Sequence, residues 1–290
     1  MSYAFTDTHC HFDFPPFTGH EVESLARAAS AGVQRIIVPT VTADRFTRVL
    51  RLAQDHAPLF AALGLHPLYI AQHHEPQLEQ LAALLAERPR KLVAVGEIGL
   101  DLYMDNPQFE RQQSVLLAQL RLAKQHDLPV ILHSRRTHDQ LAAALRRMQL
   151  PRRGVVHGFA GSLSQAQAFI RLGYYIGVGG TITYERAQKT RGVMAQLPLE
   201  ALLLETDAPD MPLAGYQGQP NRPERAAEVF QTLCELRPEP ADEIAAALEV
   251  ACRIACRSAL IVSDGITEAR SPDGDYFEHP RLRAALAERS

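Results

Sequence analysis

The chain has 290 residues, of which 46% are hydrophobic and 22% are charged, and its formal net charge at pH 7 is −3. This composition is typical of a globular protein, and the length suits two small domains or one domain of barrel size. It excludes a broad basic surface, a disulfide framework and a membrane span, and the N-terminus lacks the layout of a signal peptide, so we expect a cytoplasmic protein.

Short β-rich runs alternate with helical segments along the chain. The expected strands cover residues 3–5, 35–39, 59–63, 92–96, 130–132, 154–156, 174–178 and 202–205. The expected helices cover residues 21–31, 44–55, 76–86, 108–126, 137–149, 164–172, 186–196, 223–236 and 241–260. Strands that are apolar on both faces are typical of a parallel sheet covered by helices. Eight of them predict an α/β fold of the TIM (β/α)8 barrel type, and a doubly wound open sheet is the alternative.

The sequence contains no internal linker and no repeat, so we expect a single barrel domain over residues 1–262. Residues 263–290 differ in composition from the rest of the chain. They contain the turn-forming run Ser271-Pro272-Asp273-Gly274-Asp275, and the residues after it are rich in charge. We expect these residues to form a loosely attached surface tail.

Polar residues with metal-binding side chains interrupt the apolar pattern where the predicted strands end. The carboxyl ends of the strands converge on one rim of a barrel, which is the rim where active sites are built. The residues are His9 and His11 after the first strand, His66 after the third, Glu97 after the fourth, His133 after the fifth, His157 after the sixth and Asp207 after the eighth.

Each of these residues has an ordinary structural alternative. A lone histidine is often a hydrogen-bonded core or surface residue. Glu97 could cap a helix, and Asp207 could form a turn with the Ala-Pro pair that follows it. The set as a whole has no counterpart at the opposite rim, and it therefore predicts a metal site.

The mixture of ligands favours two ions over one. A catalytic ion usually keeps three protein ligands and an open position, whereas two ions roughly 3.5–4 Å apart that share a carboxylate would use four imidazoles and two carboxylates. His9 and His11 share a strand and would hold the first ion. His133 and His157 lie on adjacent strands and would hold the second, and Glu97 lies between the two groups, where it would bridge the ions.

Asp207 and His66 would complete the chemistry of the site. Closure of the barrel would bring Asp207 next to the first strand, so it could complete the first ion and accept a proton from the attacking water. His66 would contact the substrate or carry a proton.

The motifs that carry these residues are Thr-His-Cys-His-Phe-Asp, Gly-Leu-His-Pro, Gly-Glu-Ile-Gly-Leu-Asp, His-Ser-Arg, His-Gly-Phe and Glu-Thr-Asp-Ala-Pro. Together they resemble the TatD-type metal-dependent hydrolases over about residues 4–250, and the stretch from Glu205 to Glu224 is similar to the YjjV-like branch. The resemblance implies a TIM-barrel metallohydrolase, with deoxyribonuclease activity in some members. It implies that the metal ligands are His9, His11, Glu97, His133, His157 and Asp207, and that His66 lies near the substrate.

The chain departs from this family in its last predicted helix. Such proteins tend to have an Asn-Thr pair and an aromatic pair there, whereas this chain reads Val250-Ala251-Cys252-Arg253-Ile254-Ala255-Cys256. Cys252 and Cys256 are one helical turn apart, and we interpret them as a packing face rather than as a metal-binding pair.

The first substrate hypothesis is DNA, cleaved at its phosphodiester bonds. Arg135 follows a ligand strand and is the predicted phosphate contact, because guanidinium groups bind phosphate through two hydrogen bonds. Aromatic residues of the rim loops could stack on unpaired bases or simply pack those loops. The further basic residues at this rim are Arg136, Arg186, Lys189, Arg222 and Arg225, and the aromatic residues are Phe12, Phe14, Phe17, Tyr69 and Tyr103.

The alternative is an ester or amide hydrolase that acts on a small molecule or an aminoacyl-tRNA, since the same centre can activate water for carbonyl attack. Basic side chains along a groove would favour DNA, and a closed apolar pocket would favour the alternative. The expected cofactors are two divalent metal ions per chain, Zn, Mg or Mn. We expect a monomer without an obligate protein partner.

Overall fold

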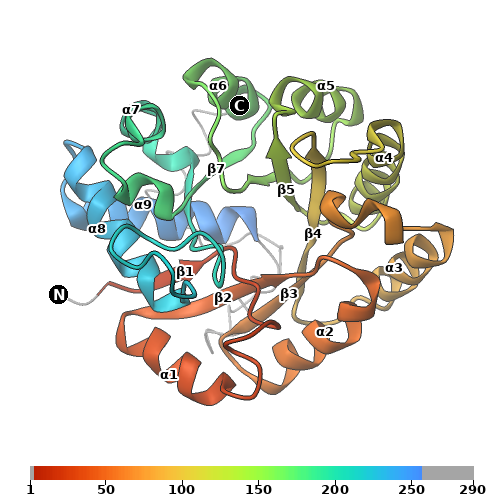
Figure 1. The fold of residues 1–290 in the computed structure, drawn as a ribbon, viewed down its shortest axis with the longest axis horizontal. Coiled ribbons are helices and arrows are strands. Elements are labelled where there is room, and N and C mark those ends of the chain that lie inside the picture. Colours follow the sequence, from red (N-terminus) through yellow and green to blue (C-terminus); the bar gives the residue numbers. More distant parts are fainter. Residues whose placement is uncertain (1–2, 257–290) are drawn as a thin grey trace, which may run out of the picture.

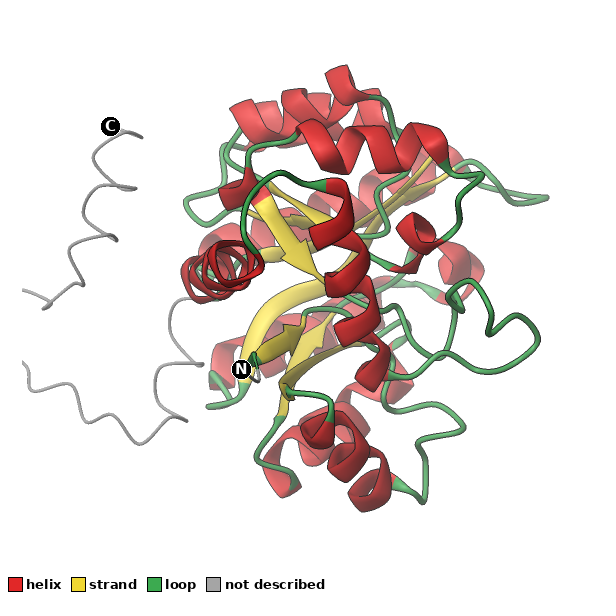
Figure 2. Ribbon diagram, turned by 90° about the vertical axis from the view of Figure 1, so that its left-hand side faces the viewer, coloured by secondary structure: helices red, strands yellow, loops and turns green. Residues whose placement is uncertain are grey.

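The computed structural model describes residues 3–256, which form a ring of eight parallel strands surrounded by helices (Figure 1). The strands are β1 (Phe5–Asp7), β2 (Val33–Pro39), β3 (Leu59–Leu63), β4 (Leu92–Asp101), β5 (Val130–Arg135), β6 (Gly154–Val156), β7 (Tyr175–Val178) and β8 (Leu202–Leu204). The helices are α1 (Glu21–Ser30), α2 (Phe46–Asp55), α3 (Glu75–Glu87), α4 (Phe109–Gln125), α5 (His138–Met148), α6 (Leu163–Arg171), α7 (Gln188–Gln196), α8 (Ala226–Leu236) and α9 (Ala241–Ala255). Figure 2 shows the strands inside a layer of helices.

Closure of the barrel takes place beyond the regular ends of β1 and β8. The strands follow one another in chain order, and each neighbouring pair from β1 to β8 is parallel. The N–H of Asp207 donates to the carbonyl of His9 at 2.8 Å, and the N–H of His11 donates to the carbonyl of Ala208 at 2.7 Å. These bonds confirm the predicted TIM barrel over the open sheet, and they place the first histidines beside Asp207.

Each strand from β2 to β8 contributes at least one side chain to the interior of the barrel. Because strand side chains alternate between faces, residues two further along a strand point the same way. Ala251, Cys252 and Cys256 belong to the same buried cluster, so the two cysteines form part of a packing face of α9. The strand residues of this cluster are Ile37, Phe60, Ala62, Val93, Ala94, Ile131, Val155, Tyr175 and Leu203.

Local sequence signals mark the change from helix to strand. Gly32 and Gly173 have φ values of 88° and 87°, which glycine adopts without steric cost, and each ends a helix shortly before a strand. At the start of α6, the Ser162 hydroxyl accepts from the N–H of Gln165, and the Gln165 side chain accepts from the N–H of Ser162.

Of the eight strands, only β3 and β6 keep their predicted bounds. The first was expected at residues 3–5, but pairing with β2 begins only at Phe5. The polar residues Thr6 and Asp7 complete β1, where both are buried and Asp7 accepts a hydrogen bond from Thr206, just past β8. The fourth was expected to end at residue 96, but β4 continues to Asp101. Its register with β5 shifts between Val95 and Ile98, and such irregularities re-aim side chains near active sites. The fifth was expected to end at residue 132, but β5 continues to Arg135 and includes His133.

Within residues 3–256, no helix combines the length and the apolar character needed to cross a bilayer. The predicted last helix, residues 241–260, is described as far as Ala255. The predicted tail at residues 263–290 lies outside the described residues.

Candidate metal centre

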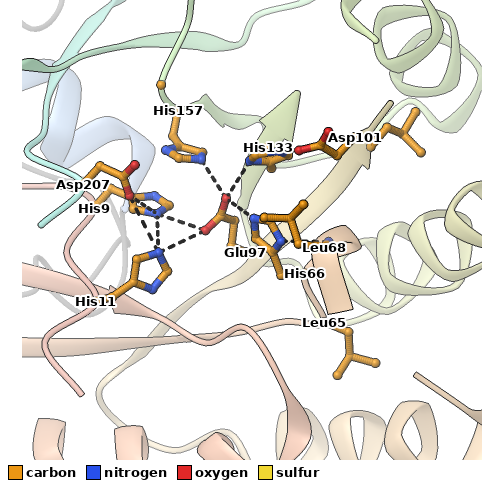
Figure 3. A network of polar contacts seen from close by, with 12 residues as sticks. His9, His11, Leu65, His66, Leu68, Glu97, Asp101, His133, His157 and Asp207 are labelled. Atoms are coloured by element: carbon orange, nitrogen blue, oxygen red, sulfur yellow. Dashed lines mark hydrogen bonds and ion pairs between the residues drawn. The ribbon is translucent and has the colours of Figure 1, made fainter. Parts of the chain in front are cut away.

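The predicted ligands meet at the carboxyl ends of the strands, as Figure 3 shows. Strand periodicity accounts for part of this arrangement, because His133 follows the inward-facing Ile131 by two residues and His157 follows Val155 by two. Asp207 follows Leu203 by four residues, past the end of β8. Its φ of 61° is unusual for a residue with a side chain, and the hydrogen bond from its N–H to the carbonyl of His9 fixes it there.

The carboxylate of Glu97 occupies the middle of the cluster, and its Oε1 faces three imidazoles. Nε2 of His157 lies 2.7 Å from this oxygen, Nε2 of His66 lies 2.8 Å away and Nδ1 of His133 lies 3.1 Å away. Glu97 is 1% exposed, so these rings replace solvent around Oε1.

The other oxygen of Glu97 faces a second group of ligands. Oε2 lies 3.1 Å from Nε2 of His9 and 3.4 Å from Nε2 of His11. The two histidine nitrogens are 3.3 Å apart, and Oδ1 of Asp207 lies 3.5 Å from the first and 3.7 Å from the second. The two oxygens of Glu97 therefore face different sets of side chains.

Glu97 is ionised in this environment. Burial alone would raise the pKa of its carboxyl, but the imidazoles of His157, His66 and His9 lower it well below the usual range. An ionised carboxylate has only acceptor atoms, so Glu97 is suited to bind cations or accept hydrogen bonds from both sides.

The second group fits a metal ion. Oε2 of Glu97 is buried and makes no hydrogen bond, although imidazole nitrogens stand close to it. Neutral imidazoles and carboxylates are ligands for Zn²⁺ and related divalent ions. Three sets of potential ligand atoms within 4.8 Å of one another occur in the described residues: His9 with His11 and Asp207, His66 with Glu97 and His133, and His9 with His157 and Glu205.

His133 is oriented by a carboxylate that follows Glu97 on β4. Its Nε2 donates to Oδ2 of Asp101 at 2.7 Å, so Nδ1, 3.1 Å from Oε1 of Glu97, is the nitrogen that would give up its proton to a cation. Burial opposes a positive charge on this ring, but the hydrogen bonds to Asp101 and Glu97 raise the pKa of His133 above its ordinary value. A ligand histidine commonly donates its other N–H to a carboxylate, so the geometry suits a metal at Nδ1.

A histidine that binds a metal ion through Nε2 carries the proton of its neutral ring on Nδ1. His66 has the opposite tautomer. Its Nδ1 accepts the N–H of Leu68 at 3.1 Å, so the proton of the neutral ring resides on Nε2 and points at Glu97. Burial lowers the pKa of His66 to about 4, which keeps the ring neutral at pH 7. His66 therefore stands in the cluster as a hydrogen-bond donor.

A second buried acid lies behind His157. Oε1 of Glu205 accepts the N–H of Gly158 at 2.6 Å and lies 3.9 Å from Nδ1 of His157. A Cβ on Gly177 would stand 2.4 Å from Oε2 of Glu205, so this glycine makes room for the carboxyl group. Burial raises the pKa of Glu205 to about 7.

The cluster opens into a cavity of about 310 Å³. Five of the predicted ligands reach it, and His66 lines it as well, whereas His9 lies beneath. None of the described residues that line this cavity is arginine or lysine. The lining residues are His11, Phe14, Pro15, Val41, His66, Leu68, Tyr69, Glu97, His133, His157, Asp207, Pro209 and Asp210.

Only some of the residues predicted to contact the substrate line this cavity. Arg135 is exposed and lies outside the cavity lining. Arg225 is 7% exposed and donates to the carbonyl of Pro220, which leaves it unavailable to a substrate. Phe12 and Phe17 are fully buried and stack on each other at 4.9 Å, so they pack the loops, whereas Phe14 and Tyr69 line the cavity.

Sequence reasoning missed Asp101 and Glu205, although both lie within the motifs that it used. The signal was strand periodicity: Asp101 follows Glu97 by four residues on β4, and Glu205 precedes Asp207 by two. Because the fourth strand was predicted to end at residue 96, Asp101 was not recognised as lying on the same strand as Glu97.

A family model described as TatD related DNase matches residues 6–255 of this chain. The chain belongs to the TatD family. It is 69% identical over 244 residues to the uncharacterized metal-dependent hydrolase YjjV of Escherichia coli K12, an alignment that covers 84% of this chain and 94% of YjjV. The crystal structure of E. coli YjjV matches the fold with a TM-score of 0.87 and 66% identity, covering 89% of this chain and 99% of that one.

A further relative carries a more specific name. The 3′-5′ ssDNA/RNA exonuclease TatD of Edwardsiella piscicida is 36% identical over 197 residues, which cover 67% of this chain and 75% of that protein. Together with the YjjV matches, this confirms the family predicted from the motifs. The chain is a metal-dependent hydrolase of the TatD family with candidate His, Asp and Glu metal-binding groups.

Proposed function

We propose that this TatD-family hydrolase is a deoxyribonuclease that cleaves DNA phosphodiester bonds with two divalent metal ions, Zn, Mg or Mn. The observation that carries the proposal is the position of Glu97, which turns one oxygen to His9 and His11 and the other to His133 and His157. The name of the Edwardsiella relative supports nucleic acid as the substrate class.

The proposed ligands form two groups, one facing each carboxylate oxygen of Glu97. His9, His11 and Asp207 would hold one ion, and His133 and His157 the other. Bound cations of this kind polarise a phosphoryl oxygen and lower the pKa of water toward ~7.

Asp207 is the proposed general base. Its side chain is 20% exposed and lines the cavity, so water can reach it, while Oδ1 lies 3.5 Å from Nε2 of His9. Burial raises the pKa of Asp207, and the positive rings of His157 and His11 oppose this. A base with a raised pKa holds the proton of the attacking water more strongly than an ordinary carboxylate does.

His66 is the proposed hydrogen-bond donor to the substrate. Its Nε2–H faces the cavity cluster, and the Leu68 N–H fixes this tautomer. The neutral ring can share this N–H with a substrate oxygen as a hydrogen bond but does not give the proton up, so the proton that the departing oxygen takes is the one that Asp207 accepts from the water.

Hydrolysis of a carboxylic ester or amide, in a small molecule or an aminoacyl-tRNA, is the second candidate. The observation that favours it is the cavity lining, which includes Phe14, Leu68 and Tyr69 but neither arginine nor lysine. A cavity of about 310 Å³ lined in this way suits a small uncharged group better than a polyanion.

The test is a substrate screen on metal-stripped enzyme reloaded with Zn²⁺, Mg²⁺ or Mn²⁺. Single-stranded DNA, bis(4-nitrophenyl) phosphate, aryl esters and an aminoacyl-tRNA are compared, and His133→Ala prepared in parallel controls for contaminating hydrolases. Metal-dependent cleavage of DNA by the wild type alone supports the proposal. Turnover of esters without cleavage of any phosphodiester would replace it with the second candidate.

A further inference from the structure

An aromatic ring flanked by two arginines stands at the rim next to the metal centre. Tyr103 is 50% exposed. The guanidinium carbon of Arg135 lies 3.8 Å from the centre of its ring, and that of Arg136 lies 4.4 Å from it. We call Tyr103, Arg135 and Arg136 the Tyr103 cluster.

The Tyr103 cluster is joined to the metal centre by short, rigid connections. Arg135 follows His133 by two residues on β5, so their Cα atoms are about 6.6 Å apart and their side chains leave the same face. The N–H of Tyr103 donates to Oδ1 of Asp101 at 2.7 Å, and Oδ2 of Asp101 contacts His133. Tyr103 therefore lies two residues beyond Asp101 at the end of β4, and Arg135 lies two residues beyond His133 at the end of β5.

The two arginines carry positive charge that no acid in the described chain neutralises. Some arginines are paired, as Arg27 is with Glu23 and Arg152 with Asp127, whereas no ion pair within residues 3–256 involves Arg135 or Arg136. The nearest acid along the chain outside the site is the exposed Asp105, two residues from Tyr103. The uncompensated charge is notable because the cavity itself lacks arginine and lysine.

The backbone around the cluster is held in place. The N–H of Leu102 donates to the carbonyl of Arg135 at 3.0 Å, and the hydroxyl of Thr137 donates to the carbonyl of Leu100 at 3.0 Å. Arg136 has a φ of 59°, a conformation that turns the chain sharply between β5 and α5. The guanidinium groups thus extend from a fixed turn and rest on the Tyr103 ring, which lowers the entropy lost when they bind a ligand.

We propose that the Tyr103 cluster binds the phosphodiester backbone of single-stranded nucleic acid just outside the cavity. A guanidinium that lies flat on an aromatic ring keeps its edge N–H groups available for two hydrogen bonds to a phosphate. Such contacts place a strand without reading its sequence. The inference rests on the proposed phosphodiesterase function, because the Tyr103 cluster would supply the cationic contacts to the substrate that the cavity lacks.

The experiment measures binding of a fluorescein-labelled dT12 oligonucleotide with phosphorothioate linkages, which resist cleavage, to the metal-loaded enzyme by fluorescence anisotropy over a range of salt concentrations. The test variant is Arg135→Ala/Arg136→Ala. Its matched control is Arg146→Ala/Arg147→Ala, which removes two adjacent exposed arginines in the last turn of α5. Thermal melting and metal content of each preparation show that the variants are folded.

We expect the test variant to raise the Kd for dT12 at least about tenfold and to reduce the slope of log K against log salt by about 1.4, the value for two phosphate contacts on a single strand. The control variant should change the Kd by less than about twofold. Tyr103→Ala should weaken binding several-fold because the guanidinium groups lose their support, and Tyr103→Phe should restore it.

The outcomes separate this inference from the proposed function. Equal binding by the test and control variants, or no binding of dT12 by the wild type, would overturn the inference whatever the enzyme hydrolyses. A wild type that binds dT12 through the Tyr103 cluster but cleaves no phosphodiester would support the inference and reject the proposed function.

Discussion

Nε2 of His133 lies 2.7 Å from Oδ2 of Asp101, and this contact fixes which nitrogen of His133 faces Glu97. Asp101 is fully buried, and its other oxygen accepts the N–H of Tyr103. Nε2 therefore keeps its proton, and Nδ1 is the nitrogen turned to the centre, which is the orientation that a metal ligand requires once Nδ1 is deprotonated.

Asp101→Ala should weaken metal binding at the half of the site that contains His133, by about 10–100-fold, because the ring loses the partner that sets its tautomer. The measurement is metal content after dialysis against a graded series of Mn²⁺ concentrations. Asp105→Ala, an exposed acid on the same loop, is the control. Indistinguishable titrations for the two variants would mean that Asp101 does not position His133.

The alanine variants of His66 and His133 should differ in metal content and in turnover. His133→Ala should lose one metal equivalent, because its Nδ1 faces the shared carboxylate. His66→Ala should keep both equivalents and lose about 10²-fold or more in kcat, because its Nε2 carries a proton rather than a free lone pair. Metal analysis and turnover on the same preparations decide this, and a lost equivalent in His66→Ala would make it a ligand.

Asp207→Asn keeps the shape of the side chain but removes the proposed base and one negative charge. We expect kcat to fall by about 10²–10⁴, which is typical of losing a general base. Metal content should fall less than in Glu97→Ala, which removes the carboxylate shared by both groups. Near-normal turnover with full metal content in Asp207→Asn would assign the base elsewhere, with His66 as the next candidate.

Metal affinity should increase as the pH rises. Burial opposes protonation of His11 and His157, but the carboxylate of Glu97 outweighs it and raises the pKa of His11 to about 9 and of His157 to about 10 in the metal-free protein. A ligand imidazole must lose its proton to bind a cation, so each displaced proton should increase the affinity about tenfold per pH unit below these values. Calorimetric titration with Mn²⁺ at pH 6.5 and 8, in buffers of different ionisation enthalpy, measures both affinity and proton release. An affinity that does not change with pH would contradict the account.

The fold and the meeting of the candidate ligands at one rim could be predicted because they depend on features that the sequence displays directly. Apolar runs define the strands, and the carboxyl ends of parallel strands converge wherever the exact bounds lie. His133 and His157 therefore meet at the predicted rim, although β5 is longer than predicted and β6 has only three residues. The predicted tail and the oligomeric state stay predictions, as do the assigned residue roles.

The remaining details depend on tertiary contacts that leave no local pattern. Asp7 reads as a loop residue, yet it belongs to β1 because Thr206 donates to its carboxylate across the closing seam of the barrel. The Gly-rich run around Glu97 looks like a turn but is an irregular part of β4. The tautomer of His66 depends on the Leu68 N–H, which only the three-dimensional structure reveals.

The central claim is that the two oxygens of Glu97 serve two different metal ions. The most direct test is anomalous diffraction from crystals of the protein reconstituted with Mn²⁺ or Zn²⁺. We expect two peaks per chain, one beside Oε2 with His9, His11 and Asp207, and one beside Oε1 with His133 and His157. A single peak at saturating metal, or a second peak that does not touch Glu97, would contradict it.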